Sequence, residues 1–170
     1  MVICKEPEST FIHIPKTGGQ SIRKWLVDNS IGQNSTKVHP HNTGKDAVGF
    51  KYCVIRDPYQ RALSAWLFSS RQNSQYSFQE FLERQVDPDM WFTKQVDYVK
   101  NCDLVLRYET LEEDFKQIQE YYDVHEPLPK INDSKYEKPW EQYYTEQAYD
   151  LVSEIFTKDI EELGYDFRRN

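Results

Sequence analysis

The architecture of this chain follows from the stretch Phe11-Ile12-His13-Ile14-Pro15-Lys16-Thr17-Gly18-Gly19-Gln20-Ser21-Ile22. A short apolar run passes directly into a lysine, two glycines and small polar residues, and a helical apolar pattern follows. This order predicts a strand, a glycine loop and the start of a helix. Glycines let backbone N–H groups turn toward an anion, and the helix N-terminus adds favourable partial charge. We therefore expect a phosphate-binding loop in which Lys16 supplies a mobile positive charge.

The order of residues in this loop separates it from the nucleoside triphosphate P-loop. That motif reads G-x-x-x-x-G-K-[ST], with the lysine after the glycines. Here Lys16 precedes Gly18 and Gly19, and no leading glycine is present. A P-loop nucleotide kinase, which requires magnesium and ATP, is therefore only an alternative. The order Pro-Lys-Thr-Gly-Gly-x-Ser resembles the 5′-phosphosulfate loop of sulfotransferases, which use 3′-phosphoadenosine-5′-phosphosulfate (PAPS).

A second anion motif follows a predicted buried strand at residues 51–55. Arg56 stands at the C-terminal end of that strand, Asp57 is suited to cap a helix, and Pro58 is suited to its first position. Ser64 then falls two turns into the same helix. A guanidinium fork together with a hydroxyl is well suited to recognise a phosphate.

The sequence Arg-Asp-Pro-x-x-Arg-x-x-Ser resembles the 3′-phosphate motif of the same sulfotransferases. The resemblance implies that Arg56 and Ser64 bind the 3′-phosphate of PAPS, although a salt-bridged arginine at a helix start is the alternative for Arg56. It assigns the 5′-phosphosulfate to Lys16, Thr17, Gly18, Gly19, Gln20 and Ser21. It also implies a contact of Lys135 with the 3′-phosphate or ribose, because its loop is similar to one that closes over the nucleotide in the polysaccharide branch. A solvated loop lysine is an equally good interpretation of Lys135.

Two histidines lie between the two anion motifs. Transfer of a sulfuryl group to a hydroxyl needs a base, and histidine can accept a proton near neutral pH. The pattern of His39, His41 and Thr43 is similar to the segment with the catalytic histidine in the heparan 2-O-type polysaccharide sulfotransferases. The resemblance implies that His41 is the base. Solvated loop histidines are the alternative, and His39 or Glu109 is a further candidate for the base.

The resemblance implies in-line attack of an acceptor hydroxyl on the sulfur of PAPS, with 3′,5′-ADP as the product. Lys16 would stabilise the developing charge, and no metal is expected, because lysine and backbone amides take its place. The acceptor is expected to be a glycan, although a tyrosyl or small-molecule acceptor stays open. A non-catalytic protein that binds 3′,5′-ADP or PAPS is a further alternative.

Composition favours one folded domain that covers residues 1–170. Aromatic residues make up 15% of the chain, charged residues 29%, and the mean hydropathy is −0.82. No run reaches the roughly twenty apolar residues of a membrane span, so we expect a soluble cytoplasmic protein without a membrane partner. The net charge of −7 disfavours nucleic acid as a partner, which prefers a basic surface.

Strand and helix patterns alternate along the chain. Residues 103–107 predict a further buried strand, and Ser77 and Thr110 each begin a predicted capping box, with glutamate three residues later. The alternation predicts a three-layer α/β fold, P-loop-like, with a small parallel sheet flanked by helices. Ligands of such sheets bind at the C-terminal ends of the strands, where both anion motifs are expected.

Overall fold

The computed structural model describes residues 2–5, 7–33, 43–71, 75–131 and 136–167. The chain folds into two compact units, and each unit combines two separate stretches of sequence. The first unit takes residues 1–56 and 97–133, and the second takes residues 57–96 and 134–170. The backbone therefore passes from one unit to the other at three places.

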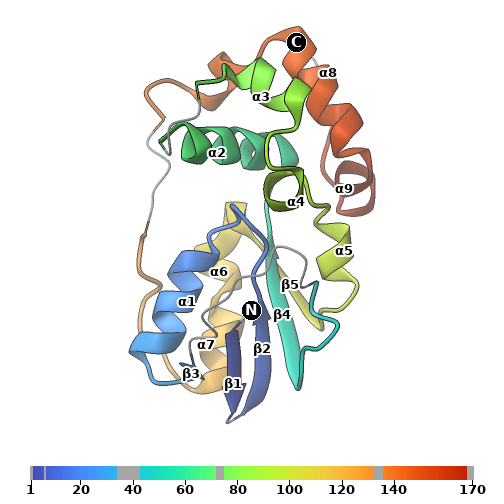
Figure 1. Ribbon diagram of the computed structural model, residues 1–170. Coiled ribbons are helices and arrows are strands. Elements are labelled where there is room, and N and C mark those ends of the chain that lie inside the picture. Colours follow the sequence, from blue (N-terminus) through green and yellow to red (C-terminus); the bar gives the residue numbers. More distant parts are fainter. Residues whose placement is uncertain (1, 6, 34–42, 72–74, 132–135, 168–170) are drawn as a thin grey trace. The chain divides into compact units, whose positions relative to one another are not determined.

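The first unit is built on a five-stranded sheet with the strand order β3-β1-β2-β4-β5. The strands are β1 (Val2–Lys5), β2 (Glu8–Ile12), β3 (Gly32–Gln33), β4 (Phe50–Ile55) and β5 (Leu104–Arg107). β2 and β5 each pair in parallel with β4, while β1 pairs antiparallel with β2 and with β3. The register sets Ile12 beside Cys53 and Ile55 beside Arg107. The carboxyl ends of β2, β4 and β5 therefore lie at one edge of the sheet (Figure 1).

The α/β class predicted from the sequence is confirmed by this small open sheet and its flanking helices. The strands predicted at residues 51–55 and 103–107 correspond to β4 and β5. The apolar run before the glycine loop forms the last residues of β2. β1 and β3 were not predicted, and they add an antiparallel edge to the parallel strands. β1 has four residues and β3 only two, so neither is long enough to give a clear alternating pattern.

Helices α1 (Gly19–Asp28), α6 (Leu111–Asp114) and α7 (Lys116–Tyr122) cover one face of this sheet (Figure 1). Alternate strand residues point into the core below them, namely Phe11, Tyr52, Val54 and Leu106. The Trp25 ring meets the Phe115 ring edge-on, with 5.0 Å between the centroids. The indole Nε1 of Trp25 also donates a hydrogen bond to the carbonyl oxygen of Glu126 at 2.6 Å. These contacts fix α1, and with it the glycine loop at its start. A short helix, α5 (Val96–Val99), precedes β5.

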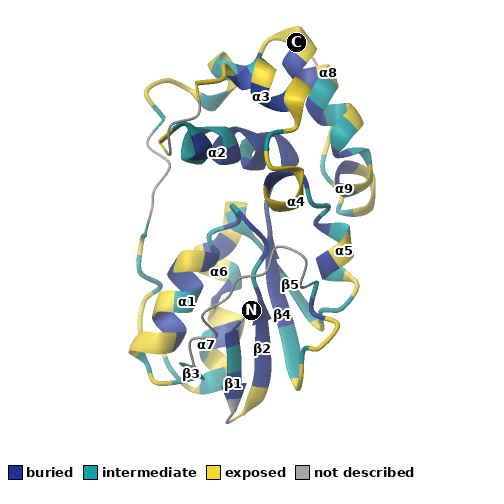
Figure 2. Cartoon of the chain, viewed as in Figure 1, coloured by how far each residue is buried: buried dark blue, intermediate teal, exposed yellow. Residues whose placement is uncertain are grey.

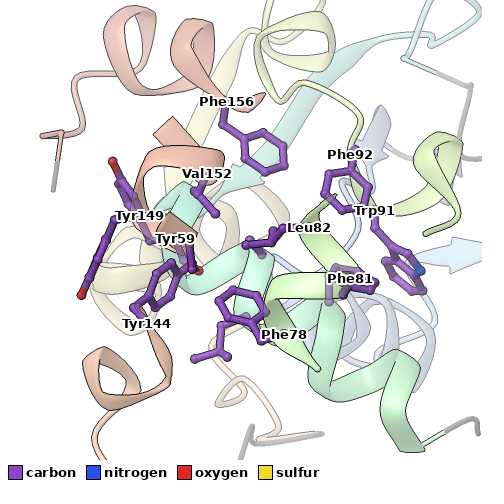
Figure 3. Packing of buried hydrophobic residues seen from close by; sticks show 14 of the residues in the cluster. Tyr59, Phe78, Phe81, Leu82, Trp91, Phe92, Tyr144, Tyr149, Val152 and Phe156 are labelled. Carbon is purple, nitrogen blue, oxygen red and sulfur yellow. Dashed lines mark hydrogen bonds between the residues drawn. The ribbon is translucent and has the colours of Figure 1, made fainter. Parts of the chain in front are cut away.

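The second unit is helical and is held together by an aromatic core. Its elements are α2 (Pro58–Arg71), α3 (Phe78–Arg84), α4 (Pro88–Trp91), a 3₁₀ turn (Trp140–Tyr143), α8 (Glu146–Ile155) and α9 (Thr157–Glu162). The Tyr144 ring packs against two other rings of this core, with centroids 4.9 Å from Phe78 and 4.4 Å from Tyr149 (Figure 3). Each helix turns its buried residues inward and its exposed residues to solvent (Figure 2). Aromatic stacking of this kind adds to the free energy gained from burial alone.

One buried ion pair links elements of the second unit. The side chains of Arg61 and Asp159 are 1% and 0% exposed, and their nearest charged atoms are 3.9 Å apart. The Arg61 Nη1 donates to the carbonyl oxygen of Thr93 at 2.9 Å, and the Asp159 carboxylate accepts from the backbone N–H groups of Gln95 and Val96. Arg61, the second arginine of the Arg-Asp-Pro motif, is therefore a structural residue of this unit.

The predicted helix caps have different outcomes. Asp57 caps α2, because its Oδ1 accepts from the backbone N–H groups of Tyr59 and Gln60 at 2.9 and 3.1 Å. The capping box at Ser77 is present at the start of α3. The one predicted at Thr110 is wrong. Thr110 ends a 3₁₀ turn (Tyr108–Thr110) that runs into α6, and its φ of −120° and ψ of 23° lie outside the extended region of a capping residue.

Candidate functional site

The loop between β2 and α1 has an unusual backbone. Lys16 and Gly18 have φ angles of +68° and +83°, so the chain turns through the left-handed region twice within three residues. Glycine adopts this conformation freely, but for a lysine it costs roughly 1–2 kcal/mol. The buried Thr17 between them donates a hydrogen bond from Oγ1 to the carbonyl oxygen of Ile14 at 2.9 Å. Strain of this kind collects at functional sites, where the surrounding structure holds it.

Neighbouring rings leave no room for a side chain at either glycine of the loop. A Cβ atom at Gly19 would lie 2.2 Å from Cδ2 of His13 and 2.5 Å from its Nε2. A Cβ atom at Gly18 would lie 3.0 Å from two ring carbons of Tyr108 and would also meet a strained φ. The loop therefore has His13 packed against one glycine and Tyr108 against the other.

The loop delivers the N-terminus of α1 without a side-chain cap. Within the described part of the chain no side chain caps Gly18, and the first turn of α1 contains no acidic residue. The backbone N–H of Ser21 donates to the carbonyl oxygen of Gly18 at 3.0 Å, which closes the first turn. A helix start of this kind offers N–H donors and positive partial charge to an anion.

Two predicted loop ligands have different surroundings. Gln20 is exposed, whereas Ser21 is 8% exposed and its Oγ accepts a hydrogen bond from the backbone N–H of Ile131 at 3.3 Å. This contact brings the chain just before residues 132–135 against the first turn of α1. The predicted nucleotide contact Lys135 belongs to residues 132–135, which lie outside the described residues.

Arg56 is the second charged group of the first unit at this edge of the sheet. It follows β4 directly, is 3% exposed, and donates from Nη1 to the carbonyl oxygen of Lys16 at 3.2 Å. Its guanidinium carbon lies 4.1 Å from the centroid of the Tyr108 ring. Arg56 and the loop of Lys16 are thus brought together, as expected for residues that follow neighbouring parallel strands.

Tyr108 is the residue of this site that sequence reasoning missed. It contacts both Gly18 and the guanidinium of Arg56. Its position was available as a signal, because Tyr108 follows β5 directly, as Arg56 follows β4. A tyrosine at a strand end is common in cores, however, and only the fold brings this ring between the loop and the arginine.

Four further predicted residues lie away from this loop or outside the described residues. Ser64 belongs to the second unit, on α2, and is 3% exposed. His39 and His41 lie outside the described residues, so the predicted base is not located. Glu109, the other candidate for the base, is exposed in the 3₁₀ turn after β5.

His13 is a packing residue of the loop and carries no charge at neutral pH. Its ring stacks on the ring of Phe11, with 5.9 Å between the centroids and 22° between the planes. Burial lowers the pKa of His13 to about 4, and the nearby positive charges of Arg23 and Lys16 act in the same direction. The imidazole is therefore neutral at pH 7, as suits a ring packed directly beneath the cationic loop.

Two features are absent from the described residues. They contain no group of three or more His, Cys, Asp or Glu side chains placed to share a metal ion. No helix among them has the length and apolar character needed to cross a bilayer.

Comparison with known proteins gave one match. The family model described as the sulfotransferase family matches residues 1–166. No curated protein and no solved structure matches the chain. The matched range covers both units, including the loop of Lys16, Arg56 and Ser64.

Proposed function

Because the chain belongs to the sulfotransferase family, we propose that it transfers the sulfuryl group of PAPS to an acceptor hydroxyl. The observation that carries this proposal is the strained loop at the start of α1, which no described side chain caps, with the Arg56 guanidinium hydrogen-bonded to its backbone. A helix N-terminus and two cationic side chains suit a nucleotide that carries phosphates at two positions. The proposal treats residues 1–170 as one sulfotransferase domain, because the family match extends over both units.

The residues present fit the 5′ end of PAPS. Lys16, Thr17, Gly18, Gly19, Gln20 and Ser21 are proposed to hold the 5′-phosphosulfate. When bound, PAPS supplies an activated sulfuryl group, and 3′,5′-ADP is the product. The backbone N–H groups of the loop are proposed to orient the phosphosulfate. Lys16 is proposed to stabilise the charge that develops on the bridging oxygen and the sulfuryl group, as a preorganised electrostatic donor.

Arg56 is proposed as the main ligand of the 3′-phosphate. It is buried, always charged, and able to form paired hydrogen bonds with phosphate oxygens. Ser64 and Lys135 are proposed as further ligands of this phosphate from the resemblance alone. Single substitutions to alanine test each of them.

The base and the acceptor rest on resemblance rather than on contacts. His41 is proposed to remove the proton of the acceptor hydroxyl, and the alternatives are His39 and Glu109. The acceptor is proposed to be a glycan, as for the heparan 2-O-type branch, with the nucleotide as the other partner. A His41→Ala chain that binds 3′,5′-ADP but has no turnover would support this role. Unchanged turnover would assign the base elsewhere.

Calorimetric titration of the full chain tests the nucleotide part of the proposal. We expect 3′,5′-ADP to bind without a metal, and Arg56→Ala to weaken it by more than tenfold, because a charged hydrogen-bonded partner is lost, worth about 1.5–3 kcal/mol. Arg84→Ala is the matched control, since Arg84 lies at the end of α3 against Tyr76. Preference for ATP with magnesium would overturn the proposal in favour of a kinase.

Turnover separates an enzyme from a protein that only binds the nucleotide. With PAPS and a panel of desulfated polysaccharides, we expect release of 3′,5′-ADP and sulfation of one acceptor. Lys16→Ala should raise the barrier by about 2–4 kcal/mol, the scale of one preorganised donor. Lys24→Ala is the control, because Lys24 forms an exposed ion pair with Asp28 on α1. Equal rates for Lys16→Ala and Lys24→Ala would contradict the proposed role of Lys16.

A further inference from the structure

Two of the three cysteines contact each other in the first unit, although they are far apart in the sequence. The thiol of Cys53 forms a hydrogen bond with the thiol of Cys102. The Cys102 thiol itself donates to the carbonyl oxygen of Tyr98 at 3.4 Å. The sulfur of Cys102 is therefore the acceptor for the Cys53 thiol, and the two sulfur atoms are neighbours.

The sheet explains why these two thiols meet. Cys53 stands in β4 between Tyr52 and Val54, whose side chains point into the core below α1. Because side chains alternate along a strand, Cys53 points to the opposite face of the sheet. Cys102 lies in the turn between α5 and β5, and β5 pairs in parallel with β4. The two thiols thus meet on the face that α1 does not cover.

The two thiols differ in their access to solvent. Cys53 is fully buried, whereas Cys102 is partly exposed. Cys102 also lines a polar pocket of about 240 Å³ at the amino ends of β4 and β5, at the edge of the sheet opposite to the glycine loop. The lining of this pocket includes the lysines Lys45, Lys51 and Lys100. A small polar reagent can therefore reach Cys102 but not Cys53.

The chemistry of the two thiols follows the same order. The hydrogen bond with Cys102, together with burial, raises the pKa of the Cys53 thiol. A thiol reacts as its thiolate, so a buried and protonated Cys53 is a poor first target for an oxidant. Cys102 is the thiol that meets an oxidant first, and Cys53 is the partner already in contact with it.

We propose that Cys53 and Cys102 form a redox-active pair that a hydroperoxide converts into a disulfide. The Cys102 sulfur attacks the O–O bond, which leaves a sulfenic acid on Cys102 and passes the thiol proton to the departing water or alcohol. The Cys53 sulfur then attacks the sulfenic sulfur, the S–O bond breaks, and water leaves with the Cys53 proton. One peroxide is reduced while both thiols are oxidised, and a dithiol such as dithiothreitol reverses the change. This site does not depend on the proposed function.

The position of the bond in the chain gives it a structural consequence. Cys53 precedes the passage from the first unit to the second, which falls between Arg56 and Asp57. Cys102 follows the return of the chain to the first unit. The disulfide therefore closes a loop around residues 57–96, the whole first stretch of the second unit, and restricts that stretch when the chain unfolds.

Peptide mapping of the full folded chain after treatment with hydrogen peroxide tests the inference. Trypsin releases the two cysteines in separate peptides, residues 52–56 and 101–107. We expect these peptides to be joined in the treated chain and separated by dithiothreitol. Cys4 is the internal control, because it is fully buried in the core below α1 and should keep its thiol. A treated chain in which both peptides stay unlinked, or in which the three cysteines pair without preference, overturns the inference.

Single substitutions test the order of the two steps. In Cys102→Ser, the Cys53 thiol should be lost at least about tenfold more slowly than in wild type, because the accessible thiol is missing. In Cys53→Ala, Cys102 should stop at the sulfenic acid, which dimedone traps, and Cys53→Ser is the second variant if Cys53→Ala does not fold. Cys4→Ser is the matched control and should form the link at the rate of wild type. Equal loss of the Cys53 thiol in wild type and in Cys102→Ser would contradict the proposed pair.

Discussion

The contact between His13 and Gly19 explains why the second glycine of the loop is required. Gly19 is helical and needs no left-handed backbone, so conformational freedom is not the reason. The reason is space, because a Cβ atom there would lie 2.2 Å from the imidazole. We predict that Gly19→Ala destabilises the chain by about 1–3 kcal/mol, the usual range for overpacking. Urea unfolding monitored by circular dichroism measures this change.

A second substitution identifies the imidazole as the cause. In a His13→Ala background the added methyl has room, so Gly19→Ala should cost much less than in wild type, with a coupling energy of about 1 kcal/mol or more. Gly32→Ala serves as a control in the same unit, since its Cβ would meet Val2 and Leu26 and not His13. Simple additivity of Gly19→Ala and His13→Ala would contradict the explanation.

His13 also makes stability depend on pH. Its pKa is lowered by burial from 6.5 to about 4, so the unfolded chain binds a proton that the folded chain does not bind between these values. The stability that belongs to the neutral ring is present above pH 6.5 and is lost as pH falls toward 4. We predict that wild type loses about 2 kcal/mol more than His13→Gln between pH 7 and pH 5.

Urea unfolding of both proteins at the two pH values measures this difference. His125→Gln is the control, because the His125 side chain is 72% exposed. A His13→Gln chain with the same pH dependence as wild type would show that folding does not shift the pKa of His13.

The sequence predicts the position of a site residue where the local order of residues determines that position. Lys16 and Arg56 follow apolar runs that end as parallel strands, so sequence alone predicts that they meet at one sheet edge. The positive φ of Lys16 was not predictable, because lysine has no preference for that conformation. Tyr108 was not predictable either, because its contacts with Gly18 and Arg56 arise only from tertiary packing.

At the scale of single elements, two similar capping motifs behave differently. Ser77 accepts from the backbone N–H of Glu80, whose carboxylate accepts from the backbone N–H of Ser77, whereas Thr110 makes no side-chain cap within the described structure. The motif therefore does not by itself ensure that a capping box forms. The backbone conformation before the helix decides whether the capping box forms, and before α6 the backbone is a 3₁₀ turn.

This difference gives a prediction with an internal control. Ser77→Ala should destabilise the chain by about 1 kcal/mol, the typical loss for an N-cap, because it removes the acceptor for the first turn of α3. Thr110→Ala should change stability by less than about 0.5 kcal/mol, as for an ordinary exposed position. Urea unfolding of both variants in the same buffer is the measurement. Equal losses would mean that the hydrogen bond at Ser77 contributes nothing.

At the scale of the whole molecule, the α/β class was predictable and the division into two units was not. The alternation of strands and helices predicts the class, and each motif is continuous in sequence. The first passage between units falls between Arg56 and Asp57, inside the second anion motif, where neither glycine nor a polar linker marks it. Contacts between distant stretches define the units, and such contacts leave no periodic pattern in one sequence.

Asp159 stabilises the second unit at the end of that unit's first sequence stretch, residues 57–96. Its carboxylate accepts from the backbone N–H groups of Gln95 and Val96 at 2.9 and 3.1 Å and lies 3.9 Å from the Arg61 guanidinium. Burial raises the pKa of Asp159, and the nearby Arg61 charge and the two backbone N–H groups oppose that rise. The carboxylate is therefore buried together with the groups that stabilise its charge.

We predict that Asp159→Ala destabilises the chain by about 3–5 kcal/mol, since one partner of a buried pair is removed while the other stays in the core. Asp159→Asn keeps one acceptor oxygen and should lose less. Asp97→Ala is the matched control, because Asp97 pairs only at the surface with Lys100, and such pairs contribute about 1 kcal/mol or less. Urea unfolding gives the three values, and hydrogen exchange of the Gln95 and Val96 amides locates the change. If Asp159→Ala and Asp97→Ala were equally stable, the hydrogen bonds of Asp159 would not be what joins α9 to the end of that stretch.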